Sequence, residues 1–399
     1  MVEFSQNLRS MRSSEIRELM SMAARPDVIS FAGGMPNNSL FPIEEIDEIY
    51  ARLPREVKQI GFQYGPTHGY PPLCRALKEY LQRKGLPLEG HELMVTTGSQ
   101  QALHLVTRVF LDPGDVTVTE DPCFIGGIAA IRAHQGVLRG VPLDDHGMDL
   151  SLLEKALNQS NPLPKLLYLT PNFHNPAGIL YSRERRQAVL RLLPGRDLVL
   201  LEDDAYAELY FADEDRDLVT PLKALGPNPV PICYTGSFSK IMGPGFRLGW
   251  LLAPADILKK CELAKQSIDA CTPTFPQVIA HEFLTSGKLE AYVARIRREY
   301  ARRAKIMLNS LSLHMPAGLE WNHPRGGFYI WVKLPPGLDA TDILKIAIPA
   351  GVVFINGKTF DPAGQRNDRL RLAFSHTPED KIEEGIRVLA GAIRKCLAE

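Results

Sequence analysis

Lys240 has neighbours that point to chemistry rather than to solvation. It lies in the stretch SFSKIMGPGFRLGW, from Ser237 to Trp250, among serines, glycines, apolar residues and one arginine. This pattern indicates a partly buried amine, because a lysine on an exposed helix face has charged or polar neighbours. Desolvation lowers the pKa of such an amine and makes it a nucleophile toward carbonyl groups. The hydroxyls of Ser237 and Ser239 and the guanidinium of Arg247 suit a phosphate. The segment therefore suits a ligand that carries a phosphate and an aldehyde.

Polar residues also follow three other predicted strands. Thr97–Gln101 opens a helix, whose first N–H groups bind an anion or are simply capped by Ser99. Thr170–Gly178 is either a rigid turn that holds an asparagine amide in place or an ordinary tight loop. Glu202–Tyr206 places acids at the end of a buried strand, where they need a cation unless one of them caps a helix. Ligands of parallel sheets bind at the carboxyl ends of the strands, so these side chains mark a candidate site.

Short apolar runs alternate with helical spacing through the middle of the chain. Strands are predicted at 93–97, 116–120, 165–170, 198–202, 231–236 and 248–253. Helical spacing follows the first strand and recurs at 182–193. Continuous apolar strands are buried on both faces, so residues 95 to about 260 predict a mostly parallel α/β lobe.

The pattern changes toward the C-terminus. A long charged helix at 289–311, several strands and a closing helix at 379–397 predict a smaller α+β lobe. We therefore expect a three-part division: an N-terminal arm at 1–45, a large cofactor-binding domain at 46–288 and a small domain at 289–399.

The composition excludes several classes of function. Among the 399 residues, lysine plus arginine number 46 and aspartate plus glutamate number 46, so no net charge favours nucleic acid or an anionic membrane. No apolar run approaches the roughly 18 residues of a membrane span, and the N-terminus does not resemble a signal peptide. The six cysteines form no C-x-x-C pair, which argues against a zinc site and favours reduced thiols in a cytoplasmic protein.

Pyridoxal phosphate has the phosphate, the aldehyde and the basic ring nitrogen that these residues suit. The motifs involved cover nearly the whole chain: FAGGMPNNSLFP, QYGPTHGYPPL, TTGSQQAL, EDPCFIG, TPNFHNPAG, EDDAY, SFSK, GFRLGW and RLRLAFS. In this order they resemble the fold-type I aminotransferases that depend on pyridoxal phosphate. They are most similar to the group that contains 2-aminoadipate, kynurenine and other multi-substrate aminotransferases.

The resemblance implies a role for each matching residue near the ring. Lys240 would form the aldimine with the cofactor and move the proton of the substrate α-carbon. Asp203 would pair with the protonated ring nitrogen. Tyr206 and Asn175 would bond the phenolic oxygen of the ring, and Phe124 would stack on it, where close relatives often have tyrosine.

The resemblance also implies contacts to the phosphate, the substrate and a second subunit. The phosphate would be held by Ser99, Gln100, Ser237, Ser239 and Arg247. Tyr64 would reach the phosphate of the neighbouring subunit, so a homodimer with shared sites is expected. Arg371 would bind the substrate carboxylate, and Gly33 and Gly34 would let the backbone approach the substrate.

The expected reaction is transamination of 2-aminoadipate or of an aromatic or aliphatic L-amino acid, with 2-oxoglutarate as the acceptor and ping-pong kinetics. Arg17 matches a mobile helix that meets the substrate side chain in this group, but a solvated arginine is an equal alternative. The Asn356–Gly357 pair stands where the family usually has Pro-Gly near the substrate, which weakens any inference about the amino donor.

Two other functions compete with this interpretation. A β-lyase would use the same proton abstraction to expel a leaving group. A transcription regulator can carry an aminotransferase-like domain as a ligand sensor, but only about thirty residues precede the first motif, too few for a winged helix-turn-helix domain.

Overall fold

The structure is a computed structural model that describes residues 3, 19, 25 and 27–398. Its largest element is an eight-stranded sheet in the order β2-β9-β8-β7-β6-β3-β4-β5. The strands, in chain order, are β2 (His91–Thr96), β3 (Val116–Asp121), β4 (Val137–Asp144), β5 (Gly147–Met148), β6 (Leu166–Leu169), β7 (Val199–Asp204), β8 (Ile232–Ser237) and β9 (Gly249–Pro254). Neighbours from β4 to β8 pair in parallel, whereas β9 and β5 run antiparallel to the strands beside them. The predicted mostly parallel sheet is therefore confirmed.

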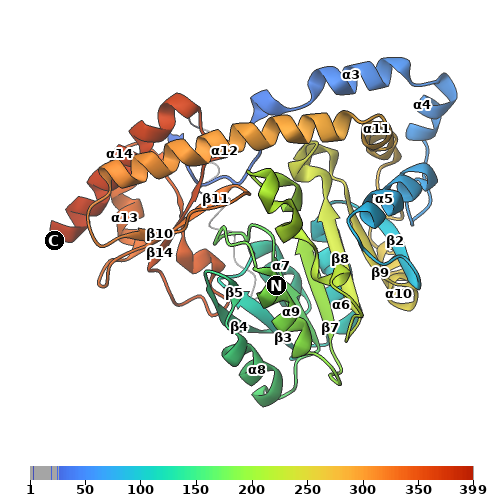
Figure 1. Ribbon diagram of the computed structural model, residues 1–399, viewed down its shortest axis with the longest axis horizontal. Helices are drawn as coiled ribbons and strands as arrows, with labels where there is room; N and C mark the ends of the chain where they lie inside the picture. The colour runs from blue at the N-terminus through green and yellow to red at the C-terminus, as the bar shows by residue number, and fades with distance from the viewer. Residues whose placement is uncertain (1–2, 4–18, 20–24, 26, 399) are drawn as a thin grey trace.

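Helices cover this sheet and extend beyond it (Figure 1). They are α3 (Ile43–Arg52), α4 (Arg55–Gly61), α5 (Pro71–Arg83), α6 (Ser99–Phe110), α7 (Ile125–Ala133), α8 (Leu150–Gln159), α9 (Arg183–Arg191), α10 (Ala255–Gln266) and α11 (Thr274–Thr285). Strands β6, β7 and β8 are buried along their whole length, as their unbroken apolar runs require. Strand β4 was not predicted, because its side chains alternate between exposed and partly buried positions. No helix among the described residues is both long and apolar enough to cross a membrane.

A second, antiparallel sheet has the order β10-β11-β14-β13. Its strands are β10 (Glu320–Trp321), β11 (Tyr329–Lys333), β13 (Ile355–Asn356) and β14 (Arg369–Ala373), and its helices are α12 (Lys288–His314), α13 (Ala340–Ala347) and α14 (Glu379–Ala398). Near the N-terminus, β1 (Ile29–Ser30) pairs in parallel with β12 (Val352–Val353), so the segment that enters the large lobe first crosses the small one. The domain boundaries at residues 45 and 288 stay predictions.

The long helix α12 runs from the small sheet across to the large lobe (Figure 1). A charged cluster on the large lobe fixes it there. Arg297 of α12 donates to the Glu208 carboxylate at 3.0 Å and to the Glu208 carbonyl at 2.5 Å. Lys84 and Tyr80 contact the same carboxylate. Burial opposes the ionisation of Glu208, yet these cations and hydrogen bonds lower its pKa to about 2. The cluster therefore holds one charged carboxylate between the two lobes.

Replacing Glu208 with glutamine tests this cluster. The Glu208→Gln variant leaves Lys84 and Arg297 poorly paired in a half-buried site, so we expect the free energy of unfolding to fall by about 3 kcal/mol. Chemical denaturation measures the change. As a matched control, Glu384→Gln removes an exposed partner of Lys381 on α14 and should leave stability unchanged within error. Equal effects of the two variants would contradict a special role for the cluster.

Candidate active site

A cavity of about 350 Å³ lies where the carboxyl ends of the large-sheet strands face the small sheet. It brings together nearly all of the predicted site residues that the structure describes. These lining residues are Gly33, Gly34, Ser99, Gln100, Phe124, Asn175, Asp203, Tyr206, Ser237, Ser239, Lys240, Arg247 and Arg371. Segments far apart in the sequence thus meet at one site.

Asp203 is a buried carboxylate without a cationic partner in the described part of the chain. It is the last residue but one of the fully buried strand β7, and its Oδ2 accepts a hydrogen bond of 2.9 Å from the Tyr168 hydroxyl. Its Oδ1 is buried and has no hydrogen-bond partner among the residues that the structure describes. Burial raises the pKa of Asp203 to about 7, in spite of the hydrogen bond from Tyr168. A cationic N–H group in the cavity would satisfy the open oxygen.

Lys240 is the opposite case, a half-buried amine that forms no ion pair with an acid in the described part of the chain. The short helix Phe238–Lys240 follows β8, and Nζ donates to the carbonyl of Gly34 at 2.9 Å. Burial lowers the pKa of Lys240 to about 8, and the charges of Arg371 and Arg247 add to this effect. Lys240 is therefore the predicted amine with a lowered pKa, and its position in the cavity leaves it accessible to a carbonyl group.

Arg371 reaches the cavity from β14 of the small sheet. It donates to Asn175 Oδ1 at 2.8 Å and to the carbonyl of Ala32 at 2.6 Å, while its buried Nε has no partner. The guanidinium lies over the Tyr329 ring, 4.5 Å from its centroid. Neutral partners orient this arginine without neutralising it, so it can still bind a carboxylate.

The start of α6 forms the other end of the cavity. Gly98 precedes the helix with φ 75° and has no side chain to cap it, so the first N–H groups are left for another acceptor. A Cβ at Gly98 would come within 2.8 Å of Arg247 Nη2, which shows how closely this arginine approaches the turn. Ser237 Oγ accepts from the backbone of Ser239 at 3.0 Å and fixes the other hydroxyl-bearing segment. These groups suit one anion.

The charges of the cavity decide what it can hold. Among the described lining residues, Lys240, Arg247 and Arg371 are cationic, and Asp203 is the acid. None of these four forms an ion pair within the described residues. The site therefore fits a ligand with an anionic group at α6, a protonatable nitrogen at Asp203, a carbonyl at Lys240 and a further carboxylate at Arg371.

One predicted site residue that the structure describes is not brought to this cavity. Tyr64 does not line it, and 87% of its surface is exposed. Arg17 lies outside the residues that the structure describes. The Asn356–Gly357 loop is also absent from the wall of this cavity.

The structure adds residues that sequence reasoning missed. Tyr329 lines the cavity, and its hydroxyl lies 2.9 Å from that of Tyr206. Tyr168 donates to Asp203, and a Cβ at Gly127 would overlap the Tyr168 ring, so glycine makes room for it. Asn172 also lines the cavity within the quoted TPNFHNPAG motif. Only Asn172 had a local signal; the two tyrosines resemble ordinary core residues in the sequence.

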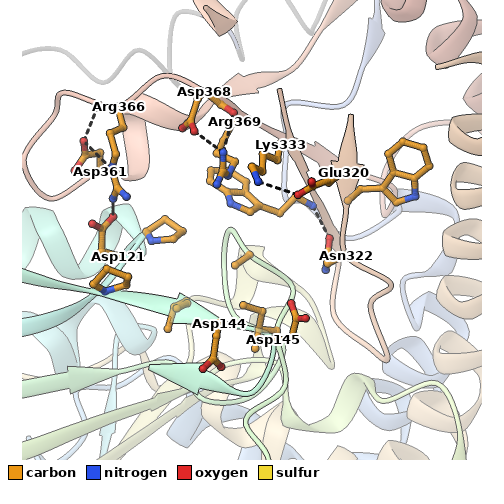
Figure 2. A pocket seen from close by; sticks show the side chains of 18 residues that line it. Asp121, Asp144, Asp145, Glu320, Asn322, Lys333, Asp361, Arg366, Asp368 and Arg369 are labelled. Carbon is orange, nitrogen blue, oxygen red and sulfur yellow. Dashed lines mark hydrogen bonds and ion pairs between the residues drawn. The ribbon is translucent and has the colours of Figure 1, made fainter. Parts of the chain in front are cut away.

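A second cavity, of about 470 Å³, lies between the lobes (Figure 2). Gly357 lines it, although the resemblance placed that loop near the substrate. Figure 2 shows its lysine and arginine side chains turned toward acids: Lys333 to Glu320, and Arg366 to Asp121 and Asp361. Arg369 pairs with Asp368. This cavity is larger, but its cations are already neutralised, so we assign the chemistry to the first cavity.

Comparisons with known proteins agree with this geometry. The family model of aminotransferase class I and II matches residues 29–389. The chain is 39% identical over 396 residues to aromatic-amino-acid aminotransferase 1 of Thermococcus litoralis, covering 98% of this chain and 94% of that protein. It is 38% identical over 395 residues to the 2-aminoadipate transaminase of Thermus thermophilus, covering 99% of this chain and 97% of that protein.

A solved structure is equally similar. The crystal structure of Pyrococcus horikoshii kynurenine aminotransferase, in complex with PMP, matches with a TM-score of 0.94 and 39% identity over 98% of this chain and 97% of that one. The predicted fold type I is thereby confirmed. The chain belongs to the class I and II aminotransferases and is an aminotransferase.

Proposed function

We propose that this aminotransferase uses pyridoxal 5′-phosphate to transfer the amino group of an L-amino acid to 2-oxoglutarate. The observation that carries the proposal is a set of charged groups in the cavity that form no ion pair with any described residue: the carboxylate of Asp203 and the cations of Lys240 and Arg371. The similar proteins are named for aromatic amino acids, 2-aminoadipate and kynurenine, and one was solved with PMP. We infer that the amino donor is 2-aminoadipate or an aromatic or aliphatic amino acid.

The residues of the cavity suit each part of the cofactor. Asp203 Oδ1 would accept from the protonated ring nitrogen, which would replace an orphaned buried oxygen with an ion pair. Phe124 would supply an aromatic face for the ring. Asn175 Oδ1 accepts from Arg371, so its amide NH₂ remains available as a donor and, with the Tyr206 hydroxyl, would suit the phenolic oxygen of the ring. The phosphate would lie at the start of α6, with Ser99, Gln100, Ser237, Ser239 and Arg247.

Bound pyridoxal phosphate supplies an aldehyde that condenses with amines and a ring that takes up the electron pair left when an amino acid loses its α-proton. Lys240 moves that proton. Because its pKa is about 8, a large fraction of Nζ is neutral near this pH and can accept the proton, then return it. The Gly34 carbonyl, 2.9 Å away, limits where Nζ can point.

Arg371 orients the substrate by its α-carboxylate. Donor and acceptor both carry this carboxylate, so both would use Arg371 in turn, which predicts ping-pong kinetics. Apolar groups of Ala32, Met35 and Ile125 line the same cavity and suit an aromatic or aliphatic side chain. We propose that Arg17 meets the second carboxylate of 2-aminoadipate or 2-oxoglutarate.

An absorbance spectrum tests the proposed function. The purified protein with added pyridoxal phosphate should show a visible band that 2-aminoadipate or phenylalanine converts to the pyridoxamine form without an acceptor. The Lys240→Ala variant should show no such conversion. Release of pyruvate from a cysteine conjugate, without that conversion, would favour the β-lyase. The absence of any cofactor band would contradict the proposal.

The pKa of Lys240 predicts the pH dependence of cofactor capture. Only the neutral amine attacks the aldehyde, so the capture rate of the apoprotein should rise about tenfold per pH unit at low pH and level off above pH about 8. Arg371→Met removes one charge that lowers this pKa, so the inflection should move upward. The reaction of pyridoxal phosphate with a free lysine derivative corrects for the titration of the cofactor. An inflection near 10.5, the ordinary lysine value, would contradict the assignment.

We further propose that the protein is a homodimer in which Tyr64 completes the partner's site. Tyr64 is 87% exposed and follows Ile60 and Phe62, which are 45% and 75% exposed. Phe62 stacks on Phe275 at 5.6 Å, so this apolar surface is an ordered part of the fold. A patch of this kind is typical of an interface.

Mixed dimers test the shared site. Tyr64→Ala and Lys240→Ala should each be strongly impaired. If Tyr64 acts across the interface, equal mixing after subunit exchange should restore about a quarter of wild-type activity, because half the dimers are mixed and each has one intact site. A failure of the mixture to exceed its two components would place Tyr64 outside the partner's site.

A further inference from the structure

The start of α6 needs an anchor that its N-cap residue does not provide. An N-cap side chain normally fixes a first helical turn by accepting from its N–H groups. Gly98 occupies that position, with no side chain to do so. A capping side chain would also compete with an anion for the same N–H groups. The start of a phosphate-binding helix is therefore best fixed by residues that leave these N–H groups free.

Gln101 and Asp269 form that anchor, next to the residues that line the cavity. Gln101 Oε1 accepts from the backbone N–H of Thr97 at 2.8 Å, which ties the first turn to the end of the preceding strand. Gln101 Nε2 then donates to Asp269 Oδ2 at 2.7 Å, and the Thr97 hydroxyl donates to the same oxygen at 2.9 Å. One carboxylate therefore fixes both sides of the Gly98–Gln100 segment.

Lys265 neutralises the charge of this carboxylate, which lies close to the predicted anion site. Its Nζ donates to Asp269 Oδ1 at 2.8 Å, and its side chain is wholly buried. Burial opposes the ionisation of Asp269, but the bonds from Lys265, Gln101 and Thr97 keep its pKa below the ordinary value. A lone carboxylate here would repel a phosphate, whereas the pair adds no net charge. Asp269 belongs to the turn between α10 and α11, far along the chain from α6.

We propose that Asp269, neutralised by Lys265, is a positioning residue for the phosphate end of the cofactor site. The inference rests on the proposed function. Thr97, Gln101, Lys265 and Asp269 do not line the cavity, so they act through the backbone of Gly98–Gln100 and not by contact with the ligand. Their effect should therefore depend on the phosphate of the ligand and not on its ring or aldehyde.

The test compares pyridoxal phosphate with pyridoxal, which has the same ring and aldehyde but no phosphate. In Asp269→Asn, Thr97, Gln101 and Lys265 compete for one amide oxygen in place of two carboxylate oxygens, so the anchor of the helix start is weakened. We expect the dissociation constant of pyridoxal phosphate to rise about tenfold and that of pyridoxal to change less than twofold, by titration of the apoprotein. The surface variant Asp342→Asn, which breaks an exposed pair with Lys345, should change neither constant.

A second variant keeps the inference testable if Asp269→Asn does not fold. Thr97→Val removes one bond to Asp269 and leaves the buried ion pair intact, so a smaller loss specific to the phosphate is expected. Equal weakening of both ligands would show a general structural role and overturn the inference, as would unchanged binding of pyridoxal phosphate. If the wild-type protein binds neither ligand, the proposed function fails instead.

Discussion

The site is organised around the carboxylate of Asp203, which is buried and has no cationic partner among the described residues. Asp203 lies one residue before the end of β7, whose six residues are all buried, and neither of its carboxylate oxygens forms an ion pair among the described residues. Tyr168 satisfies one oxygen, and Gly127 leaves the space that the Tyr168 ring needs. The folded chain therefore holds Asp203 in a costly state that a protonated ring nitrogen would relieve. Because Asp203 lies within a buried strand, its backbone is fixed by the sheet and its carboxylate stays buried.

The rest of the site depends on two lobes meeting at this strand end. Lys240 and the start of α6 follow strands of the large sheet, whereas Arg371 and Tyr329 lie in strands of the small sheet. A Cβ at Gly34 would overlap the Tyr329 hydroxyl. The N-terminal segment can therefore lie this close to Tyr329 only because residue 34 is a glycine. Helix α12 spans both lobes, and Glu208 fixes it close to the segment that carries Tyr206. Glu208, which stabilises the interface between the lobes, therefore lies close in sequence to Tyr206 but does not line the cavity.

The sequence predicts the parts of this arrangement that local patterns determine. Unbroken apolar runs predict β6, β7 and β8, and strand ends predict Asp203, Asn175 and Lys240. Other parts depend on contacts that a pattern cannot show. Strand β4 lies near the sheet edge and lacks an apolar run. Tyr168 differs from an ordinary core tyrosine only through its hydrogen bond to Asp203. Asp269 is adjacent to α6 only in the folded chain, 168 positions from Gln101. The structure brings Arg371 to the first cavity, whereas Gly357 lines the second.

The most direct test of the central claim is the stability of the apoprotein against pH, with and without Asp203. Its pKa is raised from 3.8 to about 7, so the folded state binds the extra proton between these values. The free energy of unfolding contributed by Asp203 should be highest below this window, fall as pH rises through it, and level off above pH about 7. We predict that Asp203→Asn becomes increasingly more stable than wild type over this range, by a few kcal/mol in total at most. A difference that does not change with pH would contradict the claim that Asp203 is buried without a cation.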